Sequence, residues 1–169
     1  LFGVMAAGLA GCGSGALELP SDMAQRAATC GVVAAVDARE KLKTIQGSLP
    51  LEAQGKIVHY AMLTGAEGER FEAAKAAEVV KLMPELEAKV TKGKWQELVG
   101  PCDQAFPQTV STAPIELPKD QLEAELACNG VSAFLSRAVQ TSEPKEIEQI
   151  TRYNDMRAKL DDKIGLQFK

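Results

Sequence analysis

One stretch of the chain indicates the fold class: residues 22–44, DMAQRAATCGVVAAVDAREKLKT. Small apolar side chains recur along this stretch at helical spacing, at Met23, Ala27, Cys30, Ala34 and Ala38. The preceding Ser21 suits the N-cap of a helix, and basic residues near the far end complement the helix dipole. The pattern therefore predicts a first helix from about Asp22 to Thr44, with a smooth apolar face.

The composition of the whole chain points the same way. Of its 169 residues, 46% are hydrophobic and 25% are charged, which excludes disordered, collagenous and multi-span membrane proteins. Twenty-five residues are Ala, whereas the aromatic residues are only five Phe, two Tyr and one Trp, so helix is favoured over an all-β sandwich. The formal net charge of −4 lacks the basic excess that nucleic-acid binding requires, and no nucleic-acid partner is expected.

Further helices are predicted along the chain from the same periodicity and from Pro and Gly at their ends. They run from Pro50 to Gly65, from Glu69 to Gly93, from Trp95 towards Phe106 and from Pro118 onward. Interruptions are expected at three places: a kink or break at Pro84, a stop at Gly100-Pro101 and a local break at Asn129-Gly130. The segment from Pro107 to Pro118 shows no helical period, and we expect it to cross the surface in extended form.

The last helix is predicted to begin at Ser142 and Pro144 and to be amphipathic. One stripe carries Ile147, Ile150, Tyr153, Leu160, Ile164 and Phe168. A solvated face carries Lys145, Glu148, Arg152, Asp155, Lys159 and Asp162. Residues 21–169 are thus predicted to form a single all-α domain, a five- or six-helix bundle with antiparallel or irregular orthogonal packing and one extended crossing at 107–118.

The N-terminus differs from the rest because its first eleven residues, LFGVMAAGLAG, carry only small or apolar side chains, and no charge precedes Glu18. A run this short does not cross a hydrocarbon core of about 30 Å as a helix, but its length is typical of the apolar part of a secretory signal. The alternative is a buried N-terminal helix with Cys12 as a free core cysteine. Three Gly residues disfavour it, at about 1 kcal/mol each relative to Ala.

The residues Leu9-Ala10-Gly11-Cys12 resemble the lipobox of bacterial lipoproteins. In that family the cysteine becomes the first residue of the mature chain and is acylated. The resemblance implies that residues 1–11 are part of a signal peptide, that Cys12 carries lipid, and that residues 12–20 are a tether. It also implies a membrane partner through the anchor and a periplasm-facing location in the cell envelope, with Gly13 favouring the outer membrane.

If Cys12 carries lipid, Cys30, Cys102 and Cys128 remain, in a compartment that permits disulfides. Cys102 lies near a predicted turn, Cys128 on a predicted helix, and Cys30 in the apolar face of the first helix. We expect a Cys102–Cys128 disulfide with Cys30 buried and reduced, although sequence alone leaves the pairing open. No Cys-x-x-Cys pair occurs, so redox chemistry and haem attachment are not indicated.

No catalytic constellation is visible. His59 is the only histidine and lies on a mostly polar helical face, so we expect a surface position. No His and Cys residues share the spacing of metal ligands, and neither a metal nor another cofactor is predicted. Acidic neighbours, at Glu67, Glu69 and Glu72 and at Asp161 and Asp162, are interpreted as dipole-complementing or solvated charges rather than as a cation site.

The most promising place for a ligand is a groove lined by Trp95, Phe106 and the Pro107–Pro118 segment. The leading hypothesis is a lipid-anchored envelope protein that acts as a non-catalytic binding or structural module, with no enzyme activity expected. One alternative is an envelope inhibitor or adaptor that captures a partner protein through a helical face. Another is an enzyme that uses carboxylates in an interhelical cleft.

Overall fold

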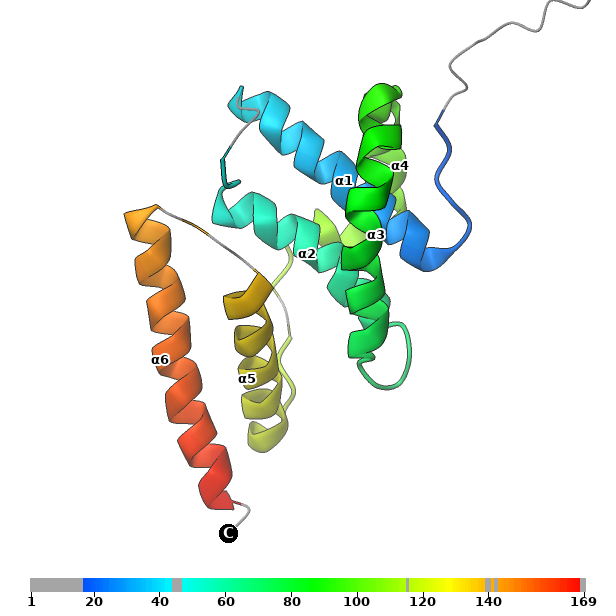
Figure 1. Cartoon of the computed structure of the whole chain (residues 1–169). Helices are drawn as coiled ribbons and strands as arrows, with labels where there is room; N and C mark the ends of the chain where they lie inside the picture. The colour runs from blue at the N-terminus through cyan, green and yellow to red at the C-terminus, as the bar shows by residue number, and fades with distance from the viewer. Residues whose placement is uncertain (1–16, 44–46, 115, 139–140, 142, 168–169) are drawn as a thin grey trace, which may run out of the picture.

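The computed structural model describes residues 17–43, 47–114, 116–138, 141 and 143–167, and in this part of the chain it contains helices and no strand (Figure 1). The elements are α1 (Met23–Leu42), α2 (Leu51–Gly65), α3 (Ala73–Lys92), the 3-10 helix η1 (Trp95–Leu98), α4 (Val99–Ala105), the 3-10 helix η2 (Pro107–Thr109), α5 (Gln121–Ala138) and α6 (Pro144–Gln167). The prediction of an all-α helical bundle is confirmed.

Helix α1 is central to the fold. Its N-cap is Asp22 rather than Ser21, because the Asp22 carboxylate accepts a hydrogen bond from the Gln25 N–H at 2.9 Å. All seven residues from Ala27 to Val33 are buried. Since seven residues cover two turns, α1 is enclosed on every side there by α2, α3, η1 and α4. Small side chains permit this: a Cβ added at Gly31 would lie 2.3 Å from the Met83 Cε atom.

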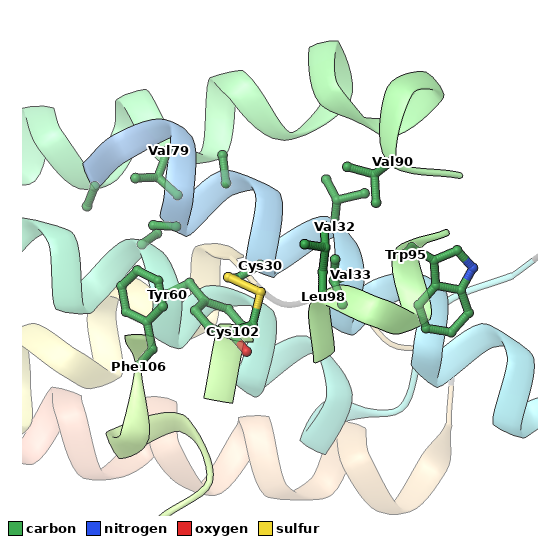
Figure 2. Packing of buried hydrophobic residues seen from close by; sticks show 14 residues of the cluster. Cys30, Val32, Val33, Tyr60, Val79, Val90, Trp95, Leu98, Cys102 and Phe106 are labelled. Atoms are coloured by element: carbon green, nitrogen blue, oxygen red, sulfur yellow. A yellow bond between two sulfur atoms is a disulfide. The ribbon is translucent and has the colours of Figure 1, made fainter. Parts of the chain in front are cut away.

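The core of α1 to α4 is continuous along α1 (Figure 2). Its buried members come from every element between α1 and Phe106: Ala27, Ala28, Cys30, Val32, Val33, Tyr60, Ala61, Ala76, Val79, Val90, Trp95, Leu98, Cys102 and Phe106. Leu17 and Leu19 are half-buried against this cluster. The last part of the predicted 12–20 tether therefore belongs to the packed structure. We call residues 17–43 and 47–109 the helical core.

At two of the predicted interruptions the helix continues without ending, and a third interruption is displaced. Helix α3 passes through Pro84 and α5 passes through Asn129-Gly130. In α3 the buried Val79 and Val90 lie on either side of the proline, so burial outweighs the lost hydrogen bond. Between η1 and α4 the change of helix type comes at Leu98, which places Pro101 in the first turn of α4, where no N–H is needed. Helix α3 also begins later than Glu69, at Ala73.

The predicted crossing at 107–118 is not wholly extended. It begins with the short helix η2, in which the Thr109 hydroxyl donates a 2.8 Å hydrogen bond to the Phe106 carbonyl. Beyond η2 the described residues up to Pro118 form no helix, as expected.

Helices α5 and α6 form an antiparallel hairpin that lies away from α1 and α3 (Figure 1). Asn129 donates to Asp161 at 2.6 Å, and Glu125 pairs with Lys163 one turn further along. The hairpin packs mainly on itself. One link to the helical core is a 2.8 Å hydrogen bond from the Leu51 N–H to Glu146 Oε1. The stretch predicted as a single domain thus has two parts of unequal packing, which we call the helical core and the hairpin.

Candidate functional site

The disulfide differs from the sequence prediction. Cys30 and Cys102 are bonded, with a Cα–Cα distance of 5.5 Å, and Cys128 is free and half-buried on α5. The predicted Cys102–Cys128 bond is therefore wrong, and Cys30 is buried as expected but is not reduced. The physical reason is the packing: α4 lies against α1, whereas α5 packs on α6.

A signal for the buried helical position of Cys102, though not for its partner, was present in the sequence. Leu98, Cys102 and Phe106 are spaced four residues apart, and all three are almost completely buried. That spacing places Cys102 on the apolar face of a short helix rather than in a turn. A cysteine on an apolar face pairs most readily with another cysteine on the face it packs against, and here that is Cys30.

The first candidate binding site is an apolar groove between α1 and α3, which we call the α1–α3 groove. It has a volume of about 910 Å³. Its lining is mainly apolar and consists of Gly31, Val32, Ala35, Val36, Arg39, Glu40, Lys43, Ile57, Val80, Met83, Pro84, Glu87, Thr91 and Trp95. Val80 remains 48% exposed in this groove although it is a large apolar side chain. The arrangement suits an apolar ligand of matching shape and offers no paired acid and base.

Charged residues of the α1–α3 groove come from the C-terminal half of α1 and from α3. The Arg39 guanidinium donates a 3.3 Å hydrogen bond to the Gly47 carbonyl, which orients it near the end of α1. Lys43 ends α1 in the left-handed conformation, with a φ of 52°. Together with Glu40 and Glu87, these groups place both signs of charge beside the apolar lining. Such charges orient a bound partner more than they strengthen its binding.

The second candidate site is a groove between α1, α2 and residues 108–114, which we call the α1–α2 groove. Its volume is about 820 Å³. Two ion pairs involve its lining: Lys41 with Asp37 at 2.7 Å, and Lys56 with Asp103 at 3.6 Å. The pKa of Lys41 is raised, chiefly by its hydrogen bond to Asp37 and also by the negative charges of Asp37 and Asp103. Asp37, Lys41 and Lys56 of the lining are paired within the protein, which reduces their attraction for an ionic ligand.

His59 also lines the α1–α2 groove and is half-buried, in contrast to the surface position expected from its polar neighbours. Burial lowers the pKa of its imidazole below the usual 6.5. The side chain is therefore neutral at physiological pH. No second histidine exists to complete a ligand pair, and no carboxylate bonded to His59 is present among the described residues.

The structure does not bring together the residues predicted to form one groove. Trp95 and Phe106 lie at opposite ends of the core (Figure 2). Trp95 lines the α1–α3 groove, whereas Phe106 is 3% exposed and packs edge-on against Tyr60, with ring centroids 5.2 Å apart. The first part of the Pro107–Pro118 segment lines the α1–α2 groove instead. Packing of Phe106 into the core separates the two ends of the predicted site.

No acidic side chain is buried within the described part of the chain. Its buried polar residues are Thr29, Thr64 and Ser132, and none of them is a carboxylate. No group of three or more His, Cys, Asp or Glu side chains suited to a metal ion occurs there either. Glu72 pairs with Lys75 at 2.7 Å, and Asp161 accepts its hydrogen bond from Asn129. The hypothesis of carboxylate catalysis in an interhelical cleft gains no support from these residues.

The lipobox residues and Cys12 lie outside the described residues. None of the described helices combines the length and the apolar character that a membrane span requires. The chain matches no protein-family model, no curated protein and no solved structure at a significant level.

Proposed function

We propose that this protein is a lipid-anchored module of the bacterial cell envelope that binds an apolar segment of another envelope component in the α1–α3 groove, without catalysing a reaction. The observation that supports the lipid anchor is the lipobox-like sequence Leu9-Ala10-Gly11-Cys12 at the end of an uncharged apolar run. The Cys30–Cys102 disulfide supports the same compartment, because buried structural disulfides are typical of exported proteins and rare in the cytosol.

The start of the folded part is consistent with a short anchor. Leu17 is only five residues after Cys12 and already packs against the core. Five residues span at most about 17 Å, so the helical core would be held close to the membrane surface. Outer-membrane attachment remains the favoured destination on the basis of Gly13.

The α1–α3 groove supports a binding role because it exposes apolar surface beside a rigid wall. The disulfide ties α1 to α4 at Cys30, next to the lining residue Gly31, and Val80 and Trp95 are part of the lining. A preformed groove loses little conformational entropy when it is filled, which favours affinity. An apolar segment of extended or helical backbone is the occupant that this lining suits best.

Mass spectrometry tests the anchor. We expect the protein expressed in a bacterium with a complete signal peptide to begin at Cys12 and to carry acyl chains. A Cys12→Ser variant is the control and should be released from membranes as an unacylated chain. An unmodified wild-type chain that retains the residues before Cys12 would contradict the proposal.

Site-specific photocrosslinking in cells tests the groove. A photoreactive residue at Val80, inside the groove, should give a discrete crosslinked product. The matched control places the same residue at Glu78, which is exposed on α3 but does not line the groove. Identical products at both positions, or none at Val80, would rule out the groove as the binding site. Because Trp95 is the only tryptophan, its fluorescence should also shift when the groove is filled.

A second candidate function is the inhibitor or adaptor that captures a partner protein through a helical face. One observation favours it: Val131, Tyr153 and Met156 of the hairpin are 47%, 45% and 41% exposed. Substitution of Tyr153 and Met156 by Ser should then abolish capture of the partner in a pull-down from envelope extracts. Unchanged capture by this variant would count against the adaptor.

A further inference from the structure

The hairpin leaves apolar surface uncovered. Within its described residues only Ser132 is buried, whereas the helical core buries fourteen residues in one cluster. The cross-helix bond between Asn129 and Asp161 occupies one side of the hairpin. Helical geometry places Val131, Tyr153 and Met156 towards the other side, where each is more than 40% exposed. The exposed apolar side chains described on that side offer a surface that a further helix face can cover.

The pattern of charges along α6 indicates which partner covers these apolar side chains. The six residues of its charged stripe alternate in sign and are spaced three and four residues apart: Lys145, Glu148, Arg152, Asp155, Lys159 and Asp162. Reversing the helix about the point between Tyr153 and Asn154 exchanges every positive residue with a negative one. Lys145 then meets Asp162, Glu148 meets Lys159, and Arg152 meets Asp155. A parallel copy in the same register would place like charges together.

Most of this stripe is available for a partner. Glu148 and Arg152 form an ion pair within the helix at 2.5 Å. The other four charged residues of the stripe form no ion pair within the described part of the chain. Charges at the edge of an apolar contact fix its orientation and register, while the apolar side chains supply most of the affinity.

We propose that α6 packs antiparallel against α6 of a second copy of this chain, about a two-fold axis that passes between Tyr153 and Asn154. Tyr153 and Met156 of the two copies then meet at the centre, and the charged stripes form complementary rows of ion pairs beside them. The contact is the same patch on both copies, as a closed two-fold dimer requires. The two hairpins together make an antiparallel four-helix bundle, which covers the apolar side chains that one hairpin leaves exposed. This goes beyond the proposed function, since it concerns the hairpin rather than the groove.

Analytical ultracentrifugation tests this pairing, with the chain from residue 12 onward carrying Cys12→Ser so that lipid does not drive association. We expect a dimer that dissociates on dilution. The double variant Glu148→Arg/Arg152→Glu keeps the composition, the net charge and the ion pair within the helix, but it sets like charges against each other in the antiparallel pairing. It should weaken dimerisation by about tenfold or more, while circular dichroism shows unchanged helix content.

A second variant restores the complementarity. Exchanging all three partners reciprocally gives Lys145→Asp/Asp162→Lys, Glu148→Lys/Lys159→Glu and Arg152→Asp/Asp155→Arg, which reverses every sign and should dimerise like the wild type. Equal dimerisation by the double variant, or a failure of the full exchange to dimerise when its helix content is normal, would overturn the antiparallel pairing. A wild-type chain that stays monomeric, or that uses Tyr153 and Met156 to bind a different protein, would overturn the dimer itself.

Discussion

Helix α1 of the helical core and helix α6 of the hairpin are both long, yet their described residues are buried to very different degrees. Helix α1 has 20 residues and is enclosed along seven consecutive positions, whereas α6 has 24 residues, of which no described one is fully buried. The difference lies in side-chain size and in the number of neighbouring elements. Small residues let α2, α3 and α4 approach α1 from several directions, while α6 packs mainly against α5. Helix formation and core formation are therefore separate properties of this chain.

The largest expected effect comes from removing the disulfide, which lies in the helical core and has no counterpart in the hairpin. Replacing both Cys30 and Cys102 by Ala opens a link between residues 72 apart in sequence, which should cost about 4 kcal/mol of unfolding free energy in the chain-entropy model. Denaturant unfolding measures this loss. Cys128→Ala in the hairpin is the control, with an expected change within about 0.5 kcal/mol. A comparable loss in the control would show that the hairpin contributes to the same cooperative unit.

A matched pair of leucines measures the packing directly. Leu98 is 2% exposed in the helical core, and Leu126 is 46% exposed in the hairpin. Leu98→Ala should lower the unfolding free energy by about 2–5 kcal/mol, because it leaves a cavity. Leu126→Ala should change it by about 0.5 kcal/mol or less. Similar values for the two variants, from the same denaturant titration, would mean that Leu126 is covered in solution.

The link between the two regions is tested at Glu146. Its carboxylate accepts hydrogen bonds from the Thr141 hydroxyl, at 2.5 Å, and from the Leu51 N–H, at 2.8 Å, and these bonds lower its pKa. Glu146→Ala should speed hydrogen exchange of the Leu51 amide and leave the amides of α1 unchanged. Glu148→Ala on the same helix is the control. Exchange at Leu51 that does not respond to Glu146→Ala would show that this contact does not hold the hairpin in place.

The smallest expected effect is the pH dependence from His59. Because burial lowers its folded pKa below 6.5, the unfolded chain binds the proton more tightly than the folded one. Stability is then fully present above the unfolded pKa and is lost as pH falls through the folded pKa. The melting temperature should fall between about pH 7.5 and pH 5.5, and His59→Gln should reduce that slope. A slope unchanged in the variant would assign the pH dependence to other groups.

The spacing of apolar residues in the sequence predicted the helices well where this spacing agrees with the burial seen in the structure. The first helix, the second helix and the amphipathic last helix were each placed within a few residues of their observed bounds. The stripe of the last helix was only partly right, since Ile150, Leu160 and Ile164 are half-buried while Ile147 and Tyr153 are exposed. Pro84 does not end α3 and Asn129-Gly130 does not end α5, because a single Pro or Gly costs less than the helix gains from its neighbours.

The candidate site was harder to predict because it depends on contacts between distant segments. Trp95 lines a groove, but its neighbours there come mainly from α1 and α3 rather than from Phe106. Phe106 instead stacks edge-on against Tyr60, a residue 46 positions earlier in the chain. No local spacing carries that information, because the approach of α4 to α2 is set by the shape of the whole core.

The sequence by itself determined the helical class, the expectation of a lipid anchor at Cys12 and the alternating charges of α6, because each follows from local spacing and composition. Only the tertiary structure decided the disulfide partner, the two grooves and the separation of the hairpin from the helical core. The physical reason is that periodicity specifies which face of a helix is apolar, whereas the size of the side chains on all the facing helices specifies which faces meet.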